Sequence, residues 1–425
     1  MPENWDAEAL LRDKAARKAL AELYGPGGIE AQAGRYATLA ALAARDAPGA
    51  ELRFYSAPGR TELGGNHTDH NRGRVLCAAV GLDALACVAP TGGSSVRLVS
   101  EGYPEPIAVD LSDLAPKAAE RGRTEALLRG VARGLADRGV EPAGFVGRMH
   151  STVLPGSGLS SSAAVELLFA TVLADLAEAR LHPVELAKIG QFAENEYFGK
   201  PCGLMDQAAS AVGGVVAIDF ADPSAPKVKR IDCDFAEEGL ELVVVSTGGS
   251  HADLTPEYAA IPAEMRSVAA FLGGEYLREV EPGLLVARGP EIRAACGDRA
   301  LLRSLHFAAE NARVQEMAQA LKEEDLKRYL KLVKKSGDSS WKLLQNLYPA
   351  GSPAEQGLPL ALSLSADYIG KKGAWRVHGG GFAGTIQAYL PRKLLPGYTA
   401  LMERYFGRGC VLRLSVRPSG AARVF

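Results

Sequence analysis

The segment Leu-Pro-Gly-Ser-Gly-Leu-Ser-Ser-Ser-Ala-Ala at residues 154–164 has the residue types that bind phosphate groups. Glycines allow several backbone N–H groups to converge on one anion, and serine hydroxyls can bind phosphate oxygens or Mg²⁺. A predicted strand precedes the segment and a predicted helix follows it, so a helix N-terminus would add N–H donors. The segment has neither the Gly-Lys-Ser/Thr of a Walker loop nor a G-x-G-x-x-G fingerprint. We therefore predict an anion site of another type, with a Gly-Ser turn that only caps the helix as the alternative.

A second cluster at residues 57–71 combines glycines with short polar side chains, in the sequence Ala-Pro-Gly-Arg-Thr-Glu-Leu-Gly-Gly-Asn-His-Thr-Asp-His-Asn. Such a density of donors and acceptors suits a ligand with many hydroxyl groups. Asp69 can accept from two neighbouring hydroxyls, while Asn66 and His67 can both donate and accept. Two other interpretations stay open: a metal site built on His67, Asp69 and His70, or a polar turn satisfied within the protein.

A third cluster, Arg-Val-His-Gly-Gly-Gly-Phe-Ala-Gly-Thr at residues 376–385, lies between two predicted strands. Glycines at this density within a sheet imply that the backbone closely approaches another group. Taken alone, the cluster is more typical of a bulge or of tight packing than of a ligand site.

The elements that must position these clusters form an α+β chain. Continuous or alternating apolar runs predict strands, and apolar residues three and four apart predict helices. Strands are predicted at 52–55, 75–88, 95–99, 145–150, 215–220, 242–247, 374–377, 387–390 and 410–417. Helices are predicted within an arm at 5–47 and at 124–139, 160–176, 183–199, 257–271, 300–321 and 324–346. The helix after the serine run is expected to bury one stripe, formed by residues 165, 168, 169, 172, 173 and 176.

Composition places the chain among ordinary globular proteins. Its 425 residues are 47% hydrophobic and 23% charged, which excludes a disordered or fibrous protein. The formal net charge of −2 gives no electrostatic footprint for nucleic acid or an anionic membrane. Six cysteines without CxxC spacing favour reduced thiols, and no apolar run is long enough to span a membrane. With no signal-peptide pattern at the start, we expect a cytoplasmic protein.

Four motifs occur in an order that is typical of one family: APGR followed by HTD, then PGSGLSSSAA, then PCGLMDQ at 201–207, then GGGFAG at 379–384. In this order the chain resembles the galactokinases, within the family of galacto-, homoserine, mevalonate and phosphomevalonate kinases (GHMP kinases). The similarity extends to AAENARV at 308–314 and VRPSGA at 416–421. It implies transfer of the γ-phosphoryl group of ATP to the anomeric hydroxyl of galactose or a close relative.

The resemblance also implies a two-domain GHMP kinase fold. The N-terminal domain would resemble domain 2 of ribosomal protein S5, and the C-terminal domain would be ferredoxin-like. We expect a helical arm at 1–50, a first domain at 51–235 that carries the sugar and phosphate loops, and a second domain at 236–425. The active site would lie between the two domains.

Roles for individual residues follow from the same resemblance. Asp206 would accept or orient the proton of the sugar hydroxyl, and Arg60 would lower the pKa of Asp206 and face the phosphate charge. Sugar contacts are implied for Asn66, His67, Asp69, Gly203 and Tyr258. ATP contacts are implied for Pro155, Gly156, Ser157, Gly158, Leu159, Ser160, Ser161, Ser162 and Gly380. The implied cofactors are ATP and Mg²⁺, with Ser162 and Glu194 as the metal ligands.

One departure from the family pattern bears on the substrate. Galactokinases usually read RxNLIGEHTDYN, and the position of their sugar-contacting Glu, which faces the C6 hydroxyl, is Asn66 here. Plant galacturonate kinases also lack this Glu and have His after the Asp, so the C6 end of the substrate is hypothesised to differ from that of galactose. Ala383 and His378 replace the usual Gly and Thr or Ser.

Three alternatives to a galactose kinase stay open. One is a kinase for a related sugar such as galacturonate, and another is a sensor that binds sugar and ATP without turnover. The third is a metal-dependent hydrolase built on the His-Thr-Asp-His segment. We expect small molecules as the only partners, no nucleic acid or membrane, and a monomer.

Overall fold

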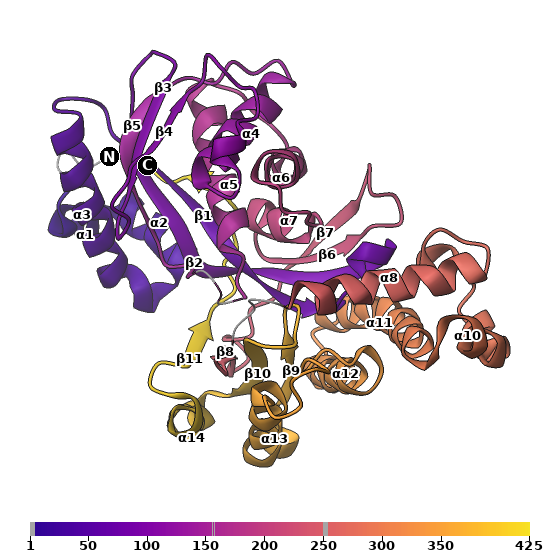
Figure 1. The fold of residues 1–425 in the computed structure, drawn as a ribbon. Helices are drawn as coiled ribbons and strands as arrows, with labels where there is room; N and C mark the ends of the chain where they lie inside the picture. The colour runs from indigo at the N-terminus through magenta and orange to yellow at the C-terminus, as the bar shows by residue number, and fades with distance from the viewer. Residues whose placement is uncertain (1–4, 155, 157, 250–253) are drawn as a thin grey trace.

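Two sheets organise the chain in the computed structural model, which describes residues 5–154, 156, 158–249 and 254–425 (Figure 1). The larger sheet has the order β12-β1-β2-β5-β3-β4, and β6 pairs with both β2 and β7. All its pairs are antiparallel except β3 with β5. Its strands are β1 (Arg53–Gly64), β2 (Arg74–Pro90), β3 (Ser95–Ser100), β4 (Ile107–Asp110), β5 (Phe145–Ser151), β6 (Val215–Asp219), β7 (Lys227–Ile231) and β12 (Ala422–Arg423).

The strand β1 contains part of the second glycine cluster, so residues 57–64 are strand and not loop. Its register against β2 shifts between Pro58 and Arg60 and again between Glu62 and Gly64. Bulges of this kind bend a strand and change the direction in which its side chains point. Here they flank the Arg60 and Glu62 positions.

Four helices cover one face of the large sheet (Figure 1). They are α4 (Thr124–Ala136), α5 (Ser161–Leu176), α6 (Pro183–Phe192) and α7 (Met205–Val212), and the π-helical turn η4 (Ala193–Phe198) continues α6. The expectation of one buried stripe on α5 is wrong. Residues 163, 164 and 166–174 are all buried, because α5 packs on β1 and β2 and is also in contact with α4, α6 and α7.

The opposite face of the sheet is covered by the N-terminal arm, as Figure 1 shows. The arm consists of α1 (Ala7–Arg12), α2 (Lys14–Tyr24) and α3 (Ile29–Asp46). A separate hydrophobic cluster joins the arm to the sheet through Leu20, Tyr36, Phe54, Cys87 and Phe425. A buried ion pair reinforces it, since Arg35 of the arm lies 2.5 Å from the Asp83 carboxylate of β2.

The second sheet is antiparallel, with the order β11-β8-β10-β9. Its strands are β8 (Leu240–Ser246), β9 (Ala374–His378), β10 (Thr385–Pro391) and β11 (Val411–Leu414). Helices α13 (Gly357–Ile369) and α14 (Leu395–Phe406) share a core with it that includes Val243, Val245 and Ile386. The other face joins the core of the first sheet, through Leu242, Val244 and Tyr389.

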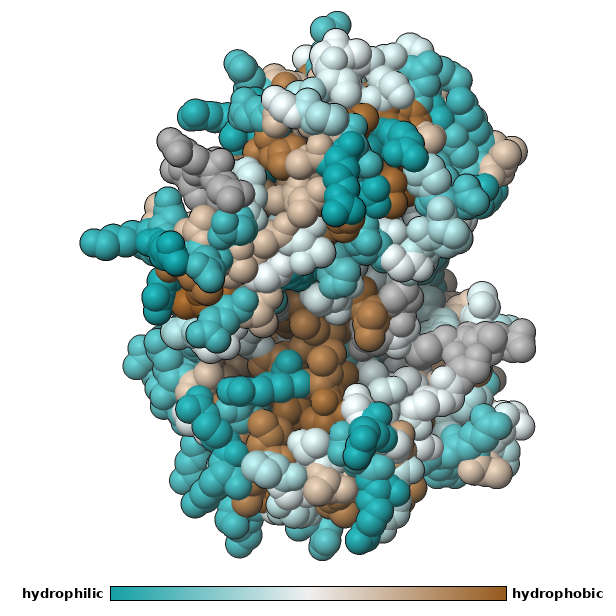
Figure 2. Space-filling view, turned by 90° about the vertical axis from the view of Figure 1, so that its left-hand side faces the viewer, coloured by the Kyte–Doolittle hydropathy of each residue, from teal (hydrophilic) through white to brown (hydrophobic). Residues whose placement is uncertain are grey.

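A group of helices lies beside the second sheet and contacts both halves of the molecule. It comprises α8 (Thr255–Phe271), α9 (Gly283–Ala287), α10 (Gly289–Cys296), α11 (Asp298–Lys322), α12 (Leu326–Ser339) and the π-helical turn η6 (Ser340–Leu344). Helix α11 packs on β2 of the first sheet, and α12 packs on β9 of the second. Seen from the side of the arm, hydrophobic residues gather in a hollow between the upper and lower halves (Figure 2).

The end of the chain returns to the first sheet, where β12 pairs with β1. The expected second domain at 236–425 therefore includes a short segment that belongs structurally with the first sheet. We propose that the domain boundary lies between β7 and β8, with residues after β11 crossing back. Among the described residues, no helix is long and apolar enough to cross a membrane.

Candidate active site

A partly buried ion pair between Arg60 and Asp206 forms the centre of the candidate site. Arg60 comes from the bulged part of β1, and Asp206 lies in the first turn of α7. The pair is bidentate, with Nε at 2.6 Å from Oδ1 and Nη2 at 2.7 Å from Oδ2. The Ser160 hydroxyl also donates to Asp206. Burial alone would raise the pKa of Asp206, but the charge and hydrogen bonds of Arg60 and Ser160 hold it below its usual value.

The serine-rich loop enters α5 directly beside this pair. Gly156, Gly158 and Ser160 have φ of +76°, +75° and +57°, so backbone N–H groups change direction sharply before the helix begins. Arg60 Nη1 donates to the Gly158 carbonyl at 2.6 Å, and Leu159 is buried. No described side chain caps the α5 N-terminus, so its first N–H groups are available to an anion.

The predicted ATP contacts fall into two groups. Gly156, Gly158, Leu159, Ser160, Ser161 and Ser162 follow one another into α5, whereas Pro155 and Ser157 lie outside the described residues. Gly380, from the second half of the chain, lines the cavity next to Asp206.

The predicted metal ligands Ser162 and Glu194 are brought together. The Ser162 hydroxyl donates to Glu194 Oε1 at 3.0 Å, and Lys200 Nζ lies 3.2 Å from the same oxygen. Glu194 lies in the π-helical turn η4, a local distortion that is frequent at functional sites. A hydroxyl and a carboxylate beside the N-terminal end of α5 supply oxygen donors, which are the ligands that Mg²⁺ prefers.

A cavity of about 470 Å³ opens beside Asp206. It is lined by Asp69, His70, Lys200, Pro201, Cys202, Gly203, Met205, Asp206, Tyr258 and Gly380. Three of the five predicted sugar contacts, Asp69, Gly203 and Tyr258, are therefore among its walls. A space of this size with polar groups on several sides suits a small polyhydroxylated ligand.

Two glycines are required for the cavity to have this shape. A Cβ atom on Gly203 would lie 2.6 Å from Asp69 Oδ2, and one on Gly380 would lie 2.6 Å from Tyr258 Cε1. The Tyr258 hydroxyl donates to the Gly381 carbonyl at 2.9 Å. The third glycine cluster therefore approaches the Tyr258 ring closely, as its composition predicted.

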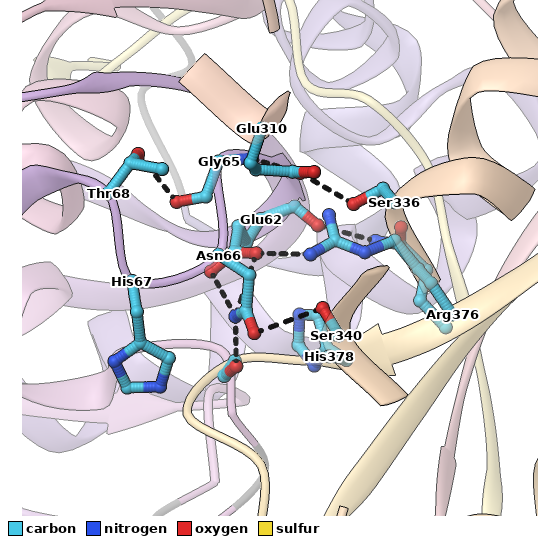
Figure 3. A network of polar contacts seen from close by, with 12 residues as sticks. Glu62, Gly65, Asn66, His67, Thr68, Glu310, Ser336, Ser340, Arg376 and His378 are labelled. Atoms are coloured by element: carbon cyan, nitrogen blue, oxygen red, sulfur yellow. Dashed lines mark hydrogen bonds and ion pairs between the residues drawn. The ribbon is translucent and has the colours of Figure 1, made fainter. Parts of the chain in front are cut away.

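The other two predicted sugar contacts, Asn66 and His67, are not among the residues that line this cavity. The Asn66 side chain is buried, and its Nδ2 donates to the Gly379 carbonyl at 2.6 Å and to Glu62 Oε1 at 3.2 Å (Figure 3). Its Oδ1 accepts from Asn346 Nδ2 at 2.8 Å. His67 Nε2 contacts the Gly380 carbonyl at 2.9 Å, and burial lowers the pKa of His67 to about 4. Both side chains therefore connect the segment after β1 to the turn at 379–381.

A buried ion pair that the sequence did not suggest lies behind Asn66. Arg376 of β9 donates to Glu62 of β1 at 2.5 Å, and both side chains are almost fully buried (Figure 3). His378 lies between the Thr61 and Thr385 hydroxyls, at 3.0 and 2.9 Å. These side-chain contacts join β1 to β9, which belong to different sheets and lie more than 300 residues apart, so no local sequence pattern encodes them.

The metal-hydrolase alternative receives no geometric support. The His67 and His70 rings lie 6.4 Å apart between centroids, and His67 Nε2 is bound to a carbonyl. Among the described residues, no three His, Cys, Asp or Glu side chains gather in a metal-binding arrangement.

Comparison with known sequences identifies two family matches. Residues 126–214 match the GHMP kinases N terminal domain, and residues 45–90 match the galactokinase galactose-binding signature. The chain is also 34% identical over 369 residues to a galactokinase from Streptomyces coelicolor, covering 85% of this chain and 91% of that protein.

Solved structures share the fold. A Lactococcus lactis galactokinase crystallised with galactose aligns with a TM-score of 0.73 at 22% identity, over 96% of this chain and 99% of that one. A Methanococcus jannaschii mevalonate kinase aligns with a TM-score of 0.62 at 16% identity, over 87% and 99% of the two chains. The α+β architecture of two packed sheets is thus that of the GHMP kinases, as the sequence motifs predicted.

Proposed function

Since the chain belongs to the galactokinase family of GHMP kinases, we propose that it transfers the γ-phosphoryl group of ATP to the anomeric hydroxyl of galactose. The observation that carries this proposal is the bidentate Arg60–Asp206 pair at the wall of the cavity, directly beside the serine-rich loop. This arrangement supplies what phosphoryl transfer to an alcohol requires: an oriented acceptor, a cation and a phosphate-binding helix end.

Asp206 would hold the sugar hydroxyl by accepting its hydrogen bond. Because the pKa of Asp206 is held low, the carboxylate is a weak base and does not remove the proton from the free alcohol. As the new O–P bond forms, the attacking oxygen gains positive character and its proton becomes acidic. That proton then passes to the Asp206 carboxylate, while the bond to the leaving ADP breaks.

Arg60 would connect the two substrates electrostatically. Its guanidinium contacts both Asp206 oxygens and also the Gly158 carbonyl of the phosphate loop. A fixed cation at this position stabilises negative charge on the transferring phosphoryl group without reorganisation. The backbone N–H groups at the start of α5 would bind the other phosphate oxygens.

Ser162 and Glu194 would hold Mg²⁺, which neutralises charge on the β- and γ-phosphates when it is bound. Lys200 adds a further positive charge next to Glu194, at the edge of the cavity. In this arrangement the residues of α5 and η4 would lie on the phosphate side of the site, and Asp206 of α7 would lie between the two substrates. Asp69, Gly203 and Tyr258 remain on the sugar side.

The direct test measures ADP release from Mg²⁺·ATP in the presence of galactose, galacturonate, N-acetylgalactosamine, glucose and arabinose. We expect galactose to give the highest kcat/KM. If no sugar causes ADP release but sugar still changes the affinity for ATP, the sensor would be supported instead.

A kinase for a related sugar is the second candidate, favoured by Asn66 at the position of the usual Glu. The cationic Lys200 lies on the cavity wall and would attract a C6 carboxylate on the sugar. A galacturonate kcat/KM above that of galactose would establish this alternative and displace the first.

A further inference from the structure

The Glu194 carboxylate is almost fully buried and is held by three neighbours. Ser162 and Lys200 both contact Oε1, whereas Gln207 Nε2 donates to Oε2 at 3.0 Å. The Lys200 side chain is 65% exposed and flexible, so it contributes little to the orientation of the Glu194 carboxylate. Gln207 is fully buried and is therefore the rigid one of the three.

Gln207 immediately follows Asp206 in the first turn of α7. Consecutive residues of a helix point about 100° apart, so α7 presents one side chain to Arg60 and the next to Glu194. Any rotation or shift of α7 moves both side chains together. The position of the carboxylate that faces the sugar hydroxyl is thus coupled to the position of the carboxylate that faces the phosphates.

A second buried carboxyl group fixes the orientation of the Gln207 amide. Gln207 Nε2 also donates to Glu166 Oε2 at 2.9 Å, so the amide nitrogen lies between two carboxyl groups. Only the N–H₂ end of an amide can donate to both, and a flipped amide would place its oxygen against two acceptors. Glu166, in the centre of α5, therefore holds Gln207 in the one orientation that supports Glu194.

The buried Glu166 carboxyl group lowers the stability of the folded protein. Glu166 is fully buried, and its Oε1 has no hydrogen-bond partner among the described residues. A Cβ atom on Gly190 would lie 3.2 Å from both Glu166 Oε2 and Gln207 Cγ, so α6 lacks a side chain where the two meet. An apolar residue would fill the position at a lower energetic cost, since a buried unpaired oxygen is unfavourable by about 1–3 kcal/mol.

We propose that Glu166 and Gln207 are positioning residues that hold Glu194 in the orientation needed to bind the divalent cation that accompanies the nucleotide. This inference rests on the proposed function, in which Glu194 is a metal ligand. It deepens that function, because it makes the buried α5–α7 contact part of the cation site. Neither residue touches substrate; each acts through Glu194.

The test measures how strongly Mg²⁺ tightens the binding of a fluorescent ATP analogue, by titration in the presence of EDTA or of increasing Mg²⁺. We expect Gln207→Ala and Glu166→Leu to raise the Mg²⁺ concentration at half-effect by about 10- to 100-fold, the usual effect of losing a partner that orients a metal ligand. Binding without Mg²⁺ should stay near that of the unmodified protein, because the backbone of the phosphate loop is unchanged.

Two further variants distinguish positioning from a general loss of packing. Glu166→Gln keeps an oxygen that accepts from Gln207 and should recover most of the Mg²⁺ response. Ser210→Ala removes another buried hydrogen bond of α7, from the Ser210 hydroxyl to the Pro58 carbonyl at 2.6 Å, without touching Glu194. Its Mg²⁺ response should equal that of the unmodified protein.

The Mg²⁺ response of these variants decides between a positioning role and a general loss of packing. An unchanged Mg²⁺ response in Gln207→Ala, or an equal loss in Ser210→Ala, overturns the proposal. If Glu166→Leu does not fold, Gln207→Ala and Glu166→Gln still decide the question. Because binding is read without any sugar, a protein that phosphorylates none of the sugars would contradict the proposed function and leave this test intact.

Discussion

Glu62 and Asn66 carry the reverse of the side chains that galactokinases usually have at these two positions, which are Asn and Glu in the sequence RxNLIGEHTDYN. In the structure the two residues are direct neighbours, since Asn66 Nδ2 lies 3.2 Å from Glu62 Oε1. The carboxylate has therefore kept its neighbourhood but now faces Arg376 of the second sheet. An exchange of this kind keeps one carboxylate at this pair of positions, next to the buried Arg376 guanidinium.

The first prediction follows from that exchange. Asn66→Glu would place two carboxylates against one guanidinium and should lower the free energy of unfolding by about 3 kcal/mol. The double variant Glu62→Asn/Asn66→Glu should recover at least about 1 kcal/mol of this loss, because the repulsion is gone. Urea unfolding of the two single variants and the double variant measures the coupling. Strictly additive effects would show that the two positions do not interact.

The second prediction concerns the Asp206 carboxylate. Asp206→Asn keeps the shape of the side chain but removes the charge and the proton acceptor, so kcat should fall by about 10²- to 10⁴-fold. ATP binding should be retained. Asp219→Asn is a matched control, since Asp219 also pairs with arginines, Arg74 and Arg278, but does not line the cavity. Equal losses in both variants would remove Asp206 from the mechanism.

Sequence reasoning located the motifs but could not tell which side chains face the cavity. Asp69 and Asn66 belong to one motif, yet Asp69 lines the cavity and Asn66 points into the contact between the sheets. The left-handed backbone at His67, with φ of +57°, separates the two directions. Lys200 and Glu166 carried no signal of their own, because their importance depends on neighbours that are distant in sequence.

At the scale of elements, helices and strands with strong periodicity were predicted closely, including β2, α4 and α11. Short elements with few residues, such as β4, β7 and β12, gave no pattern long enough to detect. The sequence predicted helices in the N-terminal arm but indicated no role for it. The structure shows that it covers the face of the large sheet opposite α4–α7, which would otherwise expose Phe54, Leu85 and Cys87.

The third prediction tests how the arm is attached. Arg35→Ala would leave the fully buried Asp83 with a weaker set of partners, and the free energy of unfolding should fall by about 3 kcal/mol. Arg12→Ala breaks an exposed ion pair with Glu8 and should change the free energy of unfolding by less than about 0.5 kcal/mol. Urea unfolding compares the two. A small loss in Arg35→Ala would mean that hydrophobic contacts alone hold the arm.

At the scale of the whole molecule, three histidines join the two halves: His306 and His378 are buried and His67 is half-buried. His67 contacts Gly380, His306 Nε2 contacts the Asn66 carbonyl at 2.9 Å, and His378 contacts Thr61. Burial lowers the pKa of His67 and His306 to about 4 and that of His378 to about 3. All three are therefore neutral in the folded protein near pH 7.

The fourth prediction is that acid weakens the contact between the halves. An unfolded histidine takes up a proton near pH 6.5, whereas these three do not until about pH 4 or below. The unfolded state thus binds more protons in this window, and stability should fall as the pH decreases from about 6.5 to about 4. Thermal unfolding between pH 7.5 and 4.5 measures this, and the decrease should be smaller in His378→Gln. A constant midpoint across that range would contradict the prediction.

The pairing of β12 with β1 has a consequence for the order in which the protein assembles. Val424 donates to the Phe54 carbonyl and Phe425 packs against Phe54 and Tyr36, so the outer edge of β1 is closed by residues synthesised long after it. While the ribosome makes the second half, β1 therefore has an open edge beside an aromatic cluster that still lacks Phe425. A growing chain of this design has to be protected from pairing with other nascent chains until β12 emerges.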